Sequence, residues 1–171
     1  MQTLIRMYGL LIRVGNSLQS PFLLLVRLYW GWQFAQTGWG KLGDINKVIN
    51  FFTSLGIPAP SLNAWFVSGL ELVGGILLIL GLGSRLIAVP LVIDMVVAYL
   101  TADRDAATKI FSDPDKFYAA APYTFLFASL LVLIFGPGRF SLDAMLARHF
   151  ARQPTFSAPT RSPISIPANR E

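Results

Sequence analysis

Apolar residues gather along the chain in four long stretches, each close to the roughly twenty residues that a helix needs to cross the hydrocarbon layer of a membrane. The stretches cover approximately residues 21–40, 62–82, 86–102 and 117–135. Only three residues separate the second stretch from the third, which predicts a tight antiparallel hairpin. The pattern therefore predicts an all-α fold, a bundle of four transmembrane helices.

The segments that flank these stretches have the pattern of helices lying on a membrane surface. In residues 1–20, polar side chains recur at helical spacing and leave a broad apolar side, which predicts an interfacial N-terminal helix. Residues 141–153 predict a second interfacial helix, and the Pro-, Ser- and Thr-rich residues 154–171 predict a disordered tail. The membrane domain itself is expected to span residues 21–140.

A short helix is also predicted between the first two stretches. Asp44 can cap it, and Gly56 with Pro58 should end it. We expect this helix to cover the mouth of the bundle as a lid, because its apolar positions form one stripe of Ile45, Val48, Ile49, Phe52 and Leu55.

Composition supports a membrane protein. Of the 171 residues, 54% are hydrophobic and 13% are charged, and the mean hydropathy is +0.56. A soluble domain carries about a quarter of its residues as charges. The chain has no cysteine, which excludes disulfides and thiolate metal sites formed by these residues.

The distribution of basic residues predicts the orientation of the bundle. The side with both termini carries eight arginines outside the stretches, against five lysines and arginines on the other side, so both termini are expected in the cytoplasm. The predicted location is a bacterial or archaeal cytoplasmic membrane. These basic residues flank spans and form no compact patch, which favours anionic lipid headgroups as their partner and argues against nucleic acid.

Three charged residues interrupt the apolar stretches. With a rise of about 1.5 Å per residue, Arg27 lies about 9 Å, Asp94 about 12 Å and Glu71 about 16 Å from the cytoplasmic ends of their spans. At these depths Arg27 could pair with both acids, provided that the helices turn these faces inward. Two acids and one arginine would then share one proton, which makes Glu71 and Asp94 candidates for proton handling. The alternative is a structural clamp between Arg27 and one acid.

Other residues near these charges have two interpretations each. Trp30 could stack on a flat ring and Gln33 could donate a hydrogen bond to a carbonyl, or both could make ordinary helix contacts. Gly74 and Gly75 allow close approach of a ligand or of another helix, and helix packing is favoured. Lys41, at the outer end of the first stretch, could contact an anionic group or lie among the headgroups.

The chain resembles the DoxX family of membrane proteins. The resemblance covers about residues 21–143 and is carried by "GWGKLGD", "FFTSLGIPAP", "ELVGGILLILGLGSRL" and "GPGRFSLD", in that order. It implies a four-helix membrane fold and a link to quinol oxidation or to thiosulfate:quinone oxidoreduction, often beside other subunits. Pro122 and Tyr123 stand where many members are expected to carry an acidic residue before an aromatic one.

These observations leave three hypotheses for function. The first is a quinone or quinol site of a redox subunit, with Glu71 or Asp94 handling a proton and electrons exchanged with a diffusible carrier or another oxidoreductase subunit. The second is a proton-coupled transporter of a small apolar or weakly acidic solute. The third is a non-catalytic assembly partner, and a homo-oligomer is compatible with all three. With His149 as the single histidine, we expect no metal site and no covalently bound cofactor.

Overall fold

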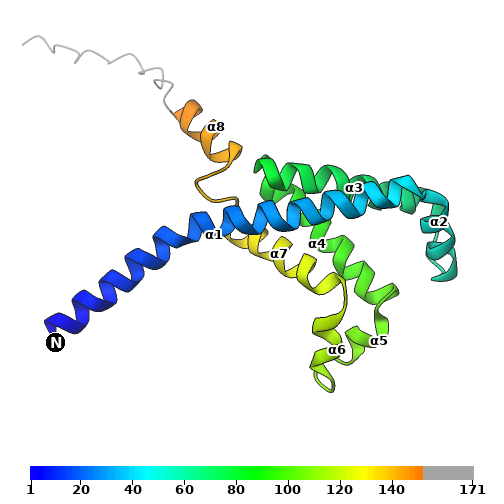
Figure 1. The fold of residues 1–171 in the computed structure, drawn as a ribbon, viewed down its shortest axis with the longest axis horizontal. Helices are drawn as coiled ribbons and strands as arrows, with labels where there is room; N and C mark the ends of the chain where they lie inside the picture. The colour runs from blue at the N-terminus through cyan, green and yellow to red at the C-terminus, as the bar shows by residue number, and fades with distance from the viewer. Residues whose placement is uncertain (152–171) are drawn as a thin grey trace, which may run out of the picture.

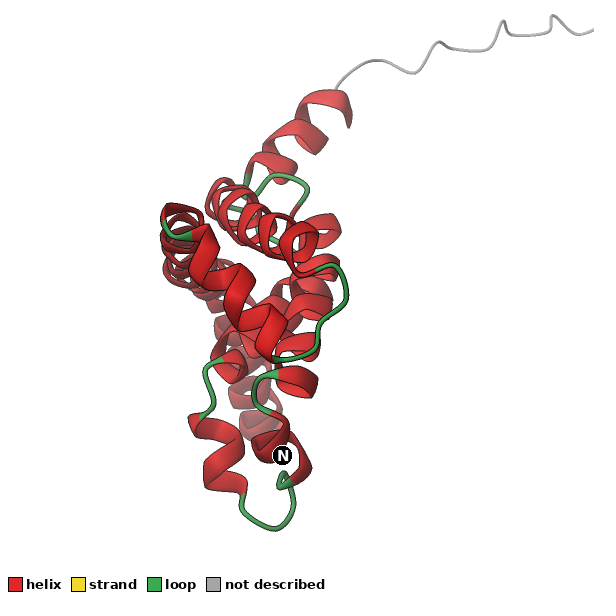
Figure 2. Ribbon diagram, turned by 90° about the vertical axis from the view of Figure 1, so that its right-hand side faces the viewer, coloured by secondary structure: helices red, strands yellow, loops and turns green. Residues whose placement is uncertain are grey.

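The computed structural model describes residues 1–151, and within this range every regular element is a helix (Figures 1 and 2). The predicted disordered tail, residues 154–171, and the last two residues of the predicted second interfacial helix lie outside the described residues. The helices are α1 (Gln2–Gly43), α2 (Ile45–Ser54), α3 (Pro60–Leu80), α4 (Ser84–Thr101), α5 (Arg104–Thr108), α6 (Pro114–Ala119), α7 (Pro122–Phe135) and α8 (Leu142–Ala151).

The sequence pattern predicts a separate N-terminal helix in residues 1–20, but the structure differs at this segment. It forms one continuous helix with the first predicted span, and Pro21 lies inside α1. A proline within a helix lacks one N–H donor and bends the helix without having to end it. The first part of α1 extends away from the other helices in Figure 1, and its side chains at positions 10–19 are exposed.

Glycines set the packing of α1 against α3. The two helices run antiparallel and contact each other along most of α3. A side chain at position 31 would lie 2.9 Å from the carbonyl oxygen of Gly75, and one at position 38 would lie 2.7 Å from that of Ser68. These distances leave no room for a Cβ atom, so the glycines let the two backbones touch. The close contacts fix the register of α1 on α3.

The predicted hairpin between the second and third stretches is confirmed. Gly81 and Gly83 adopt left-handed conformations with φ of 69° and 57°, which turn the chain from α3 into α4 within three residues. Helix α4 then packs on α7. Their contact contributes to a core that consists of Val26, Phe34, Leu78, Ala88, Leu91, Met95, Ala128 and Val132.

In the described residues 1–151, three helices are long and apolar enough to cross a membrane: the 6–43 part of α1, together with α3 and α4. Helix α7 is apolar but has only 14 residues. The predicted fourth span of residues 117–135 is divided, because Ala120 is extended and Pro122 begins α7. Many large apolar side chains on α1, α3, α4 and α7 point outward, as lipid-facing residues do.

The bundle has two ends, the α2 end and the α8 end. The α2 end contains α2, α5, α6 and the helix ends next to them. The α8 end contains the turn between α3 and α4, residues 136–141 and α8 (Figure 1).

Candidate functional site

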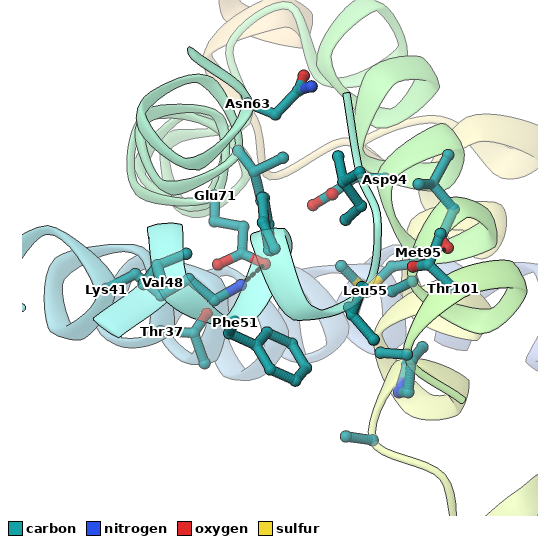
Figure 3. A pocket seen from close by; sticks show the side chains of 18 of the residues that line it. Thr37, Lys41, Val48, Phe51, Leu55, Asn63, Glu71, Asp94, Met95 and Thr101 are labelled. Carbon is teal, nitrogen blue, oxygen red and sulfur yellow. Dashed lines mark hydrogen bonds and ion pairs between the residues drawn. The ribbon is translucent and has the colours of Figure 1, made fainter. Parts of the chain in front are cut away.

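A cavity of about 1000 Å³ lies at the α2 end, between α1, α2, α3, α4 and the start of α7 (Figure 3). Its volume falls at the upper limit of typical small-molecule sites. Most of its lining is apolar, and charged groups stand out against it. The apolar lining residues are Val48, Phe51, Phe52, Leu55, Ile57, Pro58, Val67, Met95, Val97, Ala98, Ala102, Ala121, Pro122 and Phe125.

An ion pair joins two walls of this cavity. Lys41 of α1 donates from its Nζ to Oε1 of Glu71 on α3, at 2.7 Å. The Glu71 side chain is almost fully buried, with 4% exposed, whereas 34% of the Lys41 side chain is exposed. The buried Glu71 carboxylate is therefore paired with a flexible lysine side chain that is itself partly exposed.

Asp94 lines the same cavity from α4, and no cationic side chain of residues 1–151 forms an ion pair with it (Figure 3). Its Oδ2 atom is buried and accepts no hydrogen bond from the part of the chain that the structure describes, and the same is true of Oε2 of Glu71. A buried polar atom left without a partner costs about 1–3 kcal/mol. Two neighbouring helices thus present unsatisfied carboxylate oxygens at one cavity, where a ligand or water with O–H or N–H donors would satisfy them.

Helix α2 covers one side of the cavity. Asp44 caps it as predicted, accepting a hydrogen bond from the backbone N–H of Lys47 at 3.3 Å. Val48, Phe52 and Leu55 of the predicted stripe line the cavity. Phe51 also lines it, although the sequence pattern did not include this residue. No residue of α2 is fully buried, so the helix rests on the cavity without being packed into the core.

Arg27 is not near the acids, contrary to the sequence-based hypothesis. It lies at the α8 end, where its Nη2 donates to the carbonyl oxygen of Phe140 at 2.6 Å and its guanidinium packs against Gly81. Glu71 precedes Gly81 by ten residues, about 15 Å of helix. The hypothesis took Pro21 as the start of the span, whereas the glycine contacts place Gly38 beside Ser68 and Leu72, at the level of Glu71.

The other candidate residues, Trp30, Gln33, Gly74 and Gly75, lie outside the cavity lining. Trp30 packs against the core and makes an edge-to-face contact with Tyr29, with ring centroids 4.9 Å apart. Gln33 is half-buried, and neither Trp30 nor Gln33 lines the cavity. Gly74 faces Leu91 of α4, and a Cβ atom at Gly75 would lie 2.5 Å from the Gly31 carbonyl oxygen. These glycines bring helices together at a distance from the cavity.

One feature of the site was missed from the sequence. The partner of Glu71 is Lys41, which had been assigned to an outer anionic contact or to the headgroups. The glycines at positions 31, 38 and 75 were the available signal, because matching them across antiparallel helices gives the register.

Among residues 1–151, no group of three or more His, Cys, Asp or Glu side chains is arranged to hold a metal ion.

Comparisons with known proteins point to one family. The sequence model of the DoxX family matches residues 22–104. An uncharacterized membrane protein of Mycobacterium tuberculosis is 34% identical over 143 residues, which cover 80% of this chain and 88% of that protein. A Bacillus subtilis protein named "Putative oxidoreductase CatD" is 29% identical over 120 residues, 70% of this chain and 83% of that protein. No solved structure matches the chain.

Proposed function

The chain belongs to the DoxX family of integral membrane proteins, and we propose that its cavity binds the ring of a quinone or quinol, with Asp94 and Glu71 handling the protons. The observation that carries this proposal is the pair of unsatisfied carboxylate oxygens, Oε2 of Glu71 and Oδ2 of Asp94, at one largely apolar cavity. An apolar wall suits the ring and its tail, and a few polar groups orient the head.

The charged residues have separate roles in this proposal. Asp94 has no cation bonded to it, so it is the group that accepts a proton from a quinol hydroxyl. Glu71 accepts a hydrogen bond from the second hydroxyl while Lys41 holds its other oxygen. Lys41 also supplies a donor for the carbonyl oxygen of a bound quinone.

Oxidation of a quinol to a quinone removes two protons and two electrons. In this proposal Asp94 and Glu71 receive the protons in turn and release them through the α2 end of the cavity. The two electrons would be taken by a redox cofactor of a separate oxidoreductase subunit, and the reduction of that cofactor would balance the oxidation of the quinol. The name of the Bacillus subtilis relative is consistent with redox chemistry in the family.

The proposal is tested by measuring the binding of decylubiquinol and decylubiquinone to the purified protein in detergent, by calorimetry. We expect both forms to bind to the parent protein. Asp94→Asn should keep its melting temperature and lose about tenfold or more in affinity for the quinol, because the amide preserves shape but offers a weaker acceptor.

Asp115→Asn is the matched control, since Asp115 is an exposed carboxylate of α6 that does not line the cavity. It should bind both compounds as the parent does. Unchanged binding in Asp94→Asn would contradict the role of Asp94. Absence of quinone binding in the parent, together with proton-coupled flux of a weak acid such as benzoate in liposomes, would favour the transporter.

For the topology we infer four spans, with α7 as the fourth and both termini in the cytoplasm. Support comes from the exposed apolar residues Phe127, Ile134 and Phe135 along α7 and from the arginines at the α8 end. Because the chain has no cysteine, Met145→Cys and Thr108→Cys give single labelling sites. An impermeant maleimide should label them from opposite sides of sealed vesicles, and labelling from the same side would contradict four spans.

A further inference from the structure

A second hollow lies at the α8 end, far along the bundle from the carboxylates. It is a crevice of about 480 Å³ lined by Arg139, Phe140 and Arg148. Nη2 of Arg148 donates to the carbonyl oxygen of Arg139 at 3.1 Å, which holds one guanidinium at the edge of the crevice. Within residues 1–151, the lining contains two cations and no acid.

A buried cation lies behind this crevice. Arg27 is 1% exposed and bonds the carbonyl oxygen of Phe140, a crevice residue. Its Nε and Nη1 atoms are buried and have no hydrogen-bond partner among the described residues. The charge of Arg27 therefore adds to the positive potential around Phe140.

The acidic residue of α8, Asp143, already has hydrogen-bond partners. The two carboxylate oxygens of Asp143 accept hydrogen bonds from the backbone N–H groups of Gly83 and Ser84, at 2.8 and 3.1 Å. Asp143 thus caps the N-terminus of α4. Arg85 adds a further cation at this end, beside the carbonyl oxygen of Ile134 at 3.3 Å.

The described part of the α8 end therefore carries four arginines against one occupied aspartate. Two of the arginines, Arg139 and Arg148, are exposed at the crevice. An anion with several oxygens suits them, because guanidinium groups bind phosphate through paired hydrogen bonds. A phosphate placed here would compensate charge that the protein leaves unbalanced.

The surroundings of the crevice indicate what carries the phosphate. Large apolar side chains are exposed next to it in sequence on α7, on the loop and on α8, namely Ile134, Phe135, Phe140, Met145 and Leu146. Acyl chains can cover such residues, whereas a free phosphate ion leaves them exposed. We propose that the crevice between Arg139 and Arg148 is a binding site for the phosphate of an anionic phospholipid. This site is independent of the quinone proposal.

The test is native mass spectrometry of the purified full chain in mixed micelles that contain equal amounts of phosphatidylglycerol and phosphatidylcholine. We expect the retained lipid to be mainly phosphatidylglycerol. Arg139→Gln and Arg148→Gln should each reduce the ratio of retained phosphatidylglycerol to phosphatidylcholine by about fivefold, the effect of one arginine near anionic lipid. Both side chains are on the surface, so both variants are expected to fold.

Arg104→Gln is the matched control, because Arg104 is an exposed arginine at the α2 end. It should leave the ratio unchanged, and an equal fall in this variant would overturn the assignment to the crevice. Addition of inorganic phosphate at the lipid concentration should not displace phosphatidylglycerol. Displacement by phosphate, or equal retention of the two lipids, would overturn the phospholipid site.

Discussion

Glu71 and Arg27 are both buried charges within apolar helices, but the two ends of the bundle hold them differently. Glu71 is paired with Lys41 on the wall of a large cavity, and one of its oxygens is free to accept a hydrogen bond. Arg27 donates to the backbone carbonyl oxygen of Phe140 and packs against Gly81, so its guanidinium is held in one position against the loop that follows α7.

The difference concerns what a buried charge can do. A carboxylate at a cavity with a flexible counter-ion can exchange partners when a ligand or a proton arrives. A guanidinium enclosed by backbone organises the structure and creates a potential felt by its surroundings. Burial of an ionisable residue in a membrane protein therefore identifies a functional site only when space and a replaceable partner accompany it.

The largest expected effect comes from the α1–α3 contact on which both ends depend. Gly75→Ala places a Cβ atom 2.5 Å from the Ala35 nitrogen and the Gly31 carbonyl oxygen. The helices must separate, and we expect a loss of about 1–3 kcal/mol in stability. Thermal unfolding in detergent measures it. Gly69→Ala on the same helix, with no atom within 4 Å, should be neutral or slightly stabilising.

The next effect separates the two buried charges directly. Glu71→Leu leaves Lys41 without its partner and should cost about 1–2 kcal/mol, below the roughly 3–5 kcal/mol of a fully buried pair because Lys41 is partly exposed. Adding Lys41→Met should recover most of the loss in a double-mutant cycle. Adding Arg27→Met to Glu71→Leu instead should recover none of the lost stability. Recovery of stability in this double variant would support the pairing of Arg27 with Glu71 that the sequence predicts.

At the α8 end, substitution of Asp143 tests whether its carboxylate stabilises the fold. Asp143→Ala removes the acceptor for the N–H groups of Gly83 and Ser84 and should destabilise the protein by about 1 kcal/mol. Asp113→Ala is the control, since Asp113 precedes α6 and its side chain makes no capping hydrogen bond. Equal falls in melting temperature for the two variants would argue against the cap.

The lid should affect ligand exchange more than stability. Phe52→Ser opens the cavity wall, and because α2 has no buried residue, the melting temperature should change little. Dissociation of decylubiquinol, followed by stopped flow, should become several-fold faster. Ile49→Ser, on a residue of α2 outside the cavity lining, should leave the rate as it is. A matching loss of stability in Phe52→Ser would identify ordinary packing.

The smallest effect is expected in the short helix α5 at the α2 end. A hydrogen bond from Lys109 lowers the pKa of Asp105, with Lys116 adding to the effect. A lowered pKa in the folded state means that Asp105 stabilises the protein above its unfolded pKa of about 3.9 and loses this contribution as the pH falls through the folded pKa. Asp105→Asn should therefore lower the melting temperature slightly at pH 6 and leave it unchanged near pH 2.5. An equal change at both pH values would contradict the ionic contribution.

Local patterns in the sequence were sufficient for much of the architecture. Long apolar runs identified α1, α3 and α4 as spans, and the glycines at 81 and 83 matched the hairpin between α3 and α4. Asp44 and the apolar stripe after it identified α2 and its place at a cavity. These features depend on hydrophobicity, capping and turn chemistry, which act between residues close in the chain.

The sequence by itself determined that this is a helical membrane protein with charges at Arg27, Lys41, Glu71 and Asp94, and only the tertiary structure decided which of them meet. Which of these charged residues come into contact depends on the register and rotation of whole helices. These are set by the contacts of Gly31, Gly38 and Gly75. Arg27 and Lys41 lie 14 residues apart on α1, about four helical turns, so the register of α1 on α3 decides which of the two cations meets Glu71. That register is a non-local property, because it results from backbone contact between segments about forty residues apart.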